Sequence, residues 1–188
     1  VNTNSGDLAI DSGGIYLSET GNLSGQGFVY LGNGGPANAG VNAALLAHNT
    51  TSAIPNSIVT NKADTGSAIG AGTRTIGGTN IFGTVTLTGA IYLNGGTVLS
   101  STVGGTTAFT NVIANGIDTG NVSRAVTIAG SGTVLLAGNN TYSGGTSINS
   151  GTLQVGSSGT LPGGFVFVGN GGASFGNVNA SFLSANTS

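Results

Sequence analysis

GFVYLGNGGPANAGVNAALLAHNTT, from Gly27 to Thr51, returns near the end of the chain as GFVFVGNGGASFGNVNASFLSANTS, from Gly164 to Ser188. The two stretches align without a gap, are identical at 13 of 25 positions, and begin 137 residues apart. A chain that stacks similar units repeats itself in this way, whereas a catalytic domain has little reason to do so. The sequence therefore predicts one repetitive unit over residues 1–188, with 27–51 repeated at 164–188.

The composition is that of many short strands joined by tight turns. Glycine accounts for 37 of the 188 residues, only 4% of the residues are charged, and 38% are hydrophobic. A disordered chain combines low hydrophobicity with high charge, which is the opposite of this pattern. Glycine, serine, threonine and asparagine supply turns, while valine, isoleucine, leucine and phenylalanine supply strands.

Short apolar runs bounded by glycine, asparagine or serine recur along the chain and predict strands. They are 14–18, 28–32, 57–61, 83–89, 89–96, 96–101, 109–116, 125–130, 132–138, 146–151, 151–156 and 165–169. No segment sustains a helical period of 3.6 residues. The nearest to one is VNAALLAH, Val41 to His48, where an alanine-rich turn or loop is as good an interpretation as a helix.

Two all-β arrangements accommodate so many short strands. In a parallel β-helix each coil lays its strands on the coil before it, and an antiparallel β-sandwich is the alternative. The internal repeat, the dense Gly-Gly and Gly-Asn corners and the abundant asparagine favour the β-helix. At about 20–25 residues per coil and about 4.8 Å of rise per coil, we expect roughly eight coils in a rod of about 40 Å.

Residues 132–162 read GTVLLAGNNTYSGGTSINSGTLQVGSSGTLP and resemble the autotransporter-associated β-strand repeat, also called the passenger-associated transport repeat. The matching positions are Gly138, Asn140, Thr141, Tyr142, Gly144, Gly145, Thr146, Ile148, Gly151, Thr152, Leu153, Val155 and Gly156. The resemblance covers about a sixth of the chain. It implies a right-handed parallel β-helix, exported to the bacterial cell surface or beyond, whose repeat helps the passenger to fold. It implies no particular enzymatic activity.

The physical chemistry of the motif agrees with a coil corner. Gly144 and Gly145 allow a bend that a Cβ atom would block. Thr152, Leu153, Gln154 and Val155 alternate in polarity, as residues of a half-buried strand do.

Ionisable residues are few and scattered, which speaks against catalysis, metal binding and nucleic-acid binding. Three basic residues cannot neutralise a phosphate backbone, and no apolar run approaches the length of a membrane span. Asp7 and Asp11 lie four residues apart without the calcium-binding repeat GGxGxDxUx, and we expect them to be solvated acids of turns. The only histidine, His48, is replaced by Ala185 in the second copy, so we expect a surface residue and no base. We expect no enzyme, no cofactor and no metal.

Thr84, Thr86 and Thr88 form a row on one face of a predicted strand, and this row is the candidate binding face for glycans or ice. The expected function is nevertheless structural. The sequence predicts an extracellular or cell-surface β-solenoid that self-assembles or continues end to end into a fibre. The expected partner is another copy of itself, because a weakly charged surface does little to oppose self-association. An adhesin-like rod is the alternative, and a polysaccharide lyase or hydrolase is the least favoured interpretation.

Overall fold

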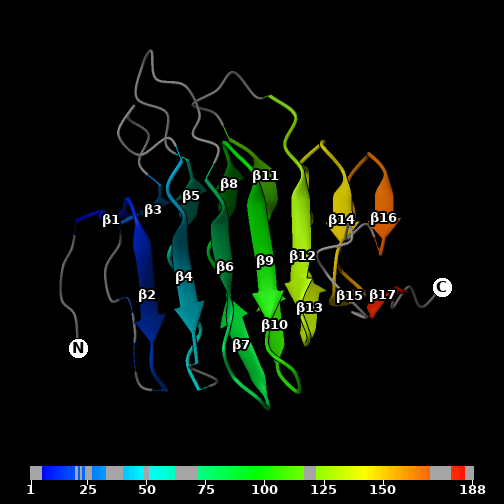
Figure 1. Ribbon diagram of the computed structural model, residues 1–188, viewed down its shortest axis with the longest axis horizontal. Coiled ribbons are helices and arrows are strands. Elements are labelled where there is room, and N and C mark those ends of the chain that lie inside the picture. The colour runs from blue at the N-terminus through cyan, green and yellow to red at the C-terminus, as the bar shows by residue number, and fades with distance from the viewer. Residues whose placement is uncertain are drawn as a thin grey trace.

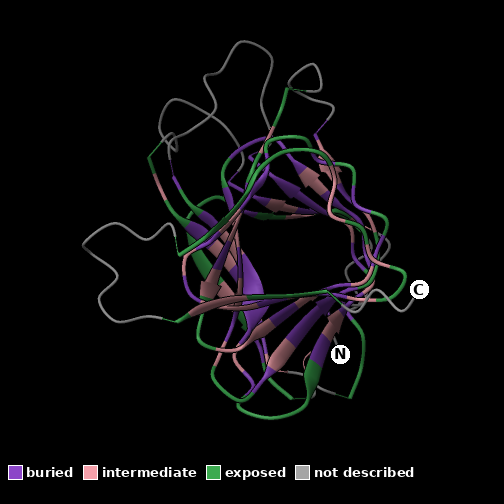
Figure 2. Ribbon diagram, turned by 90° about the vertical axis from the view of Figure 1, so that its right-hand side faces the viewer, coloured by how far each residue is buried: buried purple, intermediate pink, exposed green. Residues whose placement is uncertain are grey.

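The computed structural model describes residues 6–19, 21, 23, 27–32, 40–48, 51–61, 72–116, 122–169 and 179–184. Their strands form three parallel sheets, which are the three sides of a single column (Figures 1 and 2). Every strand pair in these sheets is parallel and in register, so the antiparallel sandwich is excluded and the parallel β-helix is confirmed.

Where a coil has strands in all three sheets, the chain visits them in the order sheet A, sheet B, sheet C. Among the described residues, the first two coils have no strand in sheet C and the last two have none in sheet A. Sheet A contains β1 (Leu8–Ile10), β3 (Val29–Leu31), β5 (Ile58–Thr60), β8 (Ile91–Leu93) and β11 (Ile113–Asn115). Sheet B contains β2 (Gly13–Leu17), β4 (Ala43–Ala47), β6 (Arg74–Gly78), β9 (Thr97–Ser101), β12 (Val126–Gly130), β14 (Thr146–Ile148) and β16 (Val166–Val168). Sheet C contains β7 (Thr84–Leu87), β10 (Thr106–Phe109), β13 (Thr133–Leu136), β15 (Gly151–Val155) and β17 (Ala180–Ser184).

The seven strands of sheet B mark seven coils, one fewer than the rough expectation of eight. In Figure 1 these strands descend in front of sheet A while the chain advances from left to right, which is the sense of a right-handed helix. Coil length varies because the connections from sheet A to sheet B vary. The connection is short where β8 ends at Leu93 and β9 begins at Thr97. It is long where β3 ends at Leu31 and β4 begins only at Ala43.

Columns of stacked aliphatic side chains form the core. In sheet B, Leu45, Ile76, Leu99, Ile128 and Ile148 occupy matched positions of five successive coils, and none is more than 1% exposed. Burying a side chain of this kind stabilises the fold by about 1.5–3 kcal/mol. Because each coil adds one member to every column, the core is continuous from end to end.

The segment from Val41 to His48 is a strand, so its interpretation as a turn, loop or helix is wrong. Ala43, Leu45 and Ala47 point into the core as β4, with β2 on one side and β6 on the other. Alanine has a low strand propensity, but the coils on both sides supply all the hydrogen-bond partners of a central strand. Tertiary context therefore decides this element.

The two copies of the repeated sequence form the same elements on different sides of the column. The strand from Val29 lies in sheet A, and its counterpart from Val166 lies in sheet B. Their flanking aromatic pairs are alike, with ring centroids 6.0 Å apart for Phe28 and Tyr30 and 5.9 Å apart for Phe165 and Phe167. The strands that follow also lie in different sheets, β4 in sheet B and β17 in sheet C. The copies thus share local structure but not their position around the axis.

Candidate functional site: the Asn–Tyr corner and the open terminal coil

Asn140 is buried at the corner where sheet A ends, with only 3% of its surface exposed. Its Oδ1 accepts a hydrogen bond of 2.9 Å from the backbone N of Ile113, the residue that begins β11 in the preceding coil. Its Nδ2 donates to the carbonyl of Thr160 in the following coil, at 2.8 Å, and to the carbonyl of Gly138, at 3.1 Å. One side chain therefore joins three coils at a place where strand pairing stops.

Tyr142 fills the core beneath this corner and is fully buried. Its hydroxyl lies 2.6 Å from Oγ1 of Thr146, and its backbone N donates to the carbonyl of Ile113. Burial raises the pKa of Tyr142, because the phenolate would lose its hydration, and the hydrogen bond with Thr146 opposes part of that rise. The ring thus replaces the aliphatic side chain that a further strand of sheet A would supply.

Replacing Tyr142 by phenylalanine should destabilise the fold by about 1 kcal/mol near neutral pH, because the buried hydroxyl of Thr146 loses its partner. The raised pKa adds a pH effect. Above about pH 10 the tyrosine of the unfolded chain ionises first, so the wild-type chain should lose stability there and the Tyr142→Phe chain should lose less.

Urea denaturation at about pH 8 and about pH 11 measures both effects. Tyr92→Phe is the matched control, since Tyr92 is half-buried on the outer side of β8. Equal alkaline losses for wild type and Tyr142→Phe would contradict the role given to the buried hydroxyl.

Two glycines after Tyr142 let the chain turn into sheet B. A Cβ atom on Gly144 would lie 2.3 Å from the carbonyl carbon of Arg124, which is backbone and cannot move aside. Gly145 has φ +83°, a conformation that other residues rarely adopt. Both positions therefore require glycine, for two different reasons.

The other motif residues build the strands on either side of this corner. Gly138 passes so close to Asn111 that an added Cβ would lie 2.1 Å from its carbonyl oxygen, and Thr141 donates its backbone N to Ile113. In β15, which begins at Gly151, Leu153 and Val155 point into the core while Thr152 is half-buried on the outside. The motif as a whole specifies a corner and its flanking strands.

The acidic residues and the histidine do not converge. Asp7 accepts a hydrogen bond from the backbone N of Phe28 at 2.9 Å, and Asp11 is exposed. His48 Nε2 lies 3.7 Å from Oε1 of Glu19 at the surface. Within the described ranges no three His, Asp or Glu side chains are placed to hold a metal ion, and Lys62, Asp64 and Asp118 lie outside those ranges.

Thr84 and Thr86 point outward from β7, and Thr88 donates its hydroxyl to the carbonyl of Ile54 at 3.4 Å. A longer hydroxyl row runs across the strands. In sheet C the positions matched to Thr84 in the next three coils are Thr106, Thr133 and Thr152, and Ser181 follows. Sequence reasoning missed this row because its members are far apart in the chain. Binding of glycans or ice by Thr84, Thr86 and Thr88 stays a prediction.

Arg74 is a buried cation. Its burial was not expected, because it lies in β6, a strand that the sequence did not predict. Its side chain is 1% exposed, and Nη1 donates to the carbonyls of Val41 and Thr73. Burial lowers the pKa of Arg74. Among the described residues it faces carbonyl oxygens and no carboxylate, so its role there is structural.

The terminal coil exposes side chains that the same sequence buries in the second coil. Val166, Val168 and Phe182 are 39%, 53% and 40% exposed. Their counterparts Val29, Leu31 and Leu45, with β5 and β6 above them, are at most 1% exposed.

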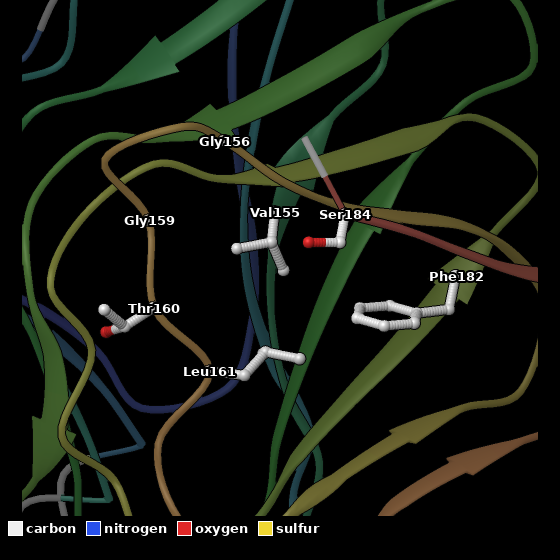
Figure 3. A pocket seen from close by; sticks show the side chains of 7 residues that line it. All are labelled: Val155, Gly156, Gly159, Thr160, Leu161, Phe182 and Ser184. Carbon is white, nitrogen blue, oxygen red and sulfur yellow. The ribbon is translucent and has the colours of Figure 1, made fainter. Parts of the chain in front are cut away.

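A pocket of about 280 Å³ opens beside this coil (Figure 3). It is lined by Val155, Gly156, Gly159, Thr160, Leu161, Phe182 and Ser184. Two of the lining side chains are apolar residues of the strands, Val155 of β15 and Phe182 of β17. Among the described residues, the apolar side chains of β16 and β17 are therefore less well covered than their counterparts in β3 and β4.

The family model of the passenger-associated transport repeat matches residues 126–155, from the start of β12 to the end of β15. This segment of the chain is therefore similar to a passenger-associated transport repeat. The match encloses the Asn140–Tyr142 corner, so the matched segment includes a coil boundary of this β-helix. Comparisons with curated proteins and with solved structures gave no match. In the described part of the chain, no helix has the length and apolarity to cross a membrane.

Proposed function

We propose that the chain is a structural protein of the bacterial surface or the extracellular space, whose copies stack end to end into a fibre. The passenger-associated transport repeat supports the location, because it is a repeat of autotransporter passengers. The exposed inner face of β16 and β17 supports the stacking.

The observation that carries the proposal is the difference between the two copies of one sequence. As β3 and β4 the sequence is buried under a further coil, and as β16 and β17 it is open. An open parallel edge presents unpaired backbone groups as well as apolar side chains, and another strand can pair with it. No reaction centre is needed in this account, and we propose that the chain is not an enzyme.

Electrostatic repulsion between copies of the chain is weak. The whole chain has a net charge of −2, and no charged residue follows Arg124. The C-terminal coil therefore brings no charged side chain of its own to such a contact, and desolvating one would cost several kcal/mol in a protein interior.

Sedimentation velocity over a wide range of protein concentration tests the proposal. We expect species that grow with concentration, because each added copy presents a new open end. A single sharp boundary of the monomer at every concentration would contradict the proposed function.

A further inference from the structure

The two copies of the repeated sequence are separated by a non-integral number of coils. From β3, in sheet A of the second coil, to β16, in sheet B of the seventh coil, the chain advances five coils and one further side. The strands β3 and β4 are therefore repeated by β16 and β17 one side further around the column.

The two ends of the column also lack strands on different sides. At the C-terminal end sheets B and C finish with β16 and β17, while sheet A has already ended at β11. At the N-terminal end sheets A and B start with β1 and β2, while sheet C starts only at β7. Within the described residues each end thus presents two adjacent strands and one side without a strand.

We infer that a second copy places its first coil on the last coil of this one after rotation by one side, about 120°, so that β1 covers β16 and β2 covers β17. The inference rests on the proposed end-to-end stacking and specifies its register. Without the rotation only β2 and β16 would pair, and both β1 and β17 would face a side without a strand. With it, both free edges are paired and the two sides without strands coincide.

Strand lengths and side chains fit this register. Three-residue β16 would meet three-residue β1, and five-residue β17 would meet five-residue β2. The same lengths recur where β5 and β6 cover β3 and β4, the earlier copies of β16 and β17.

Across the junction, apolar side chains that point into the core would stack on other apolar side chains. Leu8 and Ile10 already match Val29 and Leu31 in sheet A, and Val166 and Val168 are the repeated counterparts of those two residues. On the side without strands, Leu161 would lie against Leu23 of the next copy, and these two leucines are themselves repeat counterparts. The core columns of the two copies would therefore be continuous.

Mixing single-cysteine variants distinguishes the two registers, and the chain has no cysteine of its own to interfere. In the rotated register Ala9 lies beside Phe167, and Gly14 beside Ser181, as Ala9 lies beside Tyr30 and Gly14 beside Ala44 within the chain. In the unrotated register the columns of sheet B bring Gly14 beside Phe167. Neighbouring Cα atoms of paired strands are within reach of a disulfide.

We expect oxidation of Ala9→Cys mixed with Phe167→Cys, and of Gly14→Cys mixed with Ser181→Cys, to give disulfide-linked dimers on a non-reducing gel. Gly14→Cys mixed with Phe167→Cys should stay monomeric, and circular dichroism of each variant checks that it is folded. Dimers only from the last mixture would overturn the rotated register while leaving the stacking intact. No dimer from any mixture would overturn the inference, and monomeric sedimentation of the wild-type chain would then reject the proposed function as well.

Discussion

Replacing Asn140 by alanine is expected to destabilise the fold by about 2–4 kcal/mol. The substitution leaves the backbone N of Ile113 without an acceptor and takes a donor from the carbonyls of Gly138 and Thr160. A buried polar group that loses its partner costs about 1–3 kcal/mol, and water has little access where Asn140 is 3% exposed. Urea denaturation followed by far-ultraviolet circular dichroism measures the loss.

Asn139→Ala is the matched control, because it removes the same kind of side chain one residue earlier. Asn139 is exposed, and its Oδ1 accepts one hydrogen bond of 3.0 Å from the hydroxyl of Thr160. We expect a change within about 1 kcal/mol for this variant. Equal effects of the two substitutions would show that Asn140 does not join the coils as described.

Replacing Val168 by lysine is expected to prevent assembly while preserving the folded monomer. Val168 points inward from the last strand of sheet B but is 53% exposed, so an isolated chain can keep the ammonium group in water. Under a further coil the same group would be buried without a partner, at a cost of several kcal/mol. Association should weaken at least about a hundredfold, since each 1.4 kcal/mol is a factor of ten.

Phe82→Lys provides the control for added charge and lost apolar surface. Phe82 is 67% exposed in the connection between β6 and β7, away from both ends of the column. We expect it to sediment as the wild-type chain does. Assembly of Val168→Lys at wild-type concentrations would exclude the terminal coil as the contact surface.

The sequence predicted the parallel column because its signals are local and repeated. Runs such as 96–101 and 151–156 alternate in polarity between glycine corners, and the structure has strands there at Thr97–Ser101 and Gly151–Val155. The Gly144–Gly145 corner was predicted from the missing Cβ atoms, and the structure adds the close backbone of Arg124 as the reason.

Strands that depend on their neighbours were not predicted. RTIGG, now β6, begins with an arginine and ends with two glycines, so its own residues do not favour a strand. It forms one because β4 and β9 pair with both of its edges. The alanines of β4 are a similar case. In a stacked fold the adjacent coil supplies the hydrogen bonds, which a pattern within one segment cannot reveal.

The candidate site was predictable in its residues but not in its geometry. The motif includes both Asn140 and Tyr142, and an asparagine near a turn commonly bonds to the backbone of its own loop. The structure instead directs it to the coils before and after. The sequence also could not predict that the two repeat copies lie on different sides of the column. That shift depends on the lengths of all the connections over five coils.

Electron microscopy of the assembled chain would show whether copies stack end to end. Stacking of seven-coil copies predicts unbranched filaments one column wide, with an axial rise of about 34 Å per copy and a rotation near 120° between copies. Particles that remain single short columns at high concentration, or copies that associate through the sides of the sheets, would contradict it.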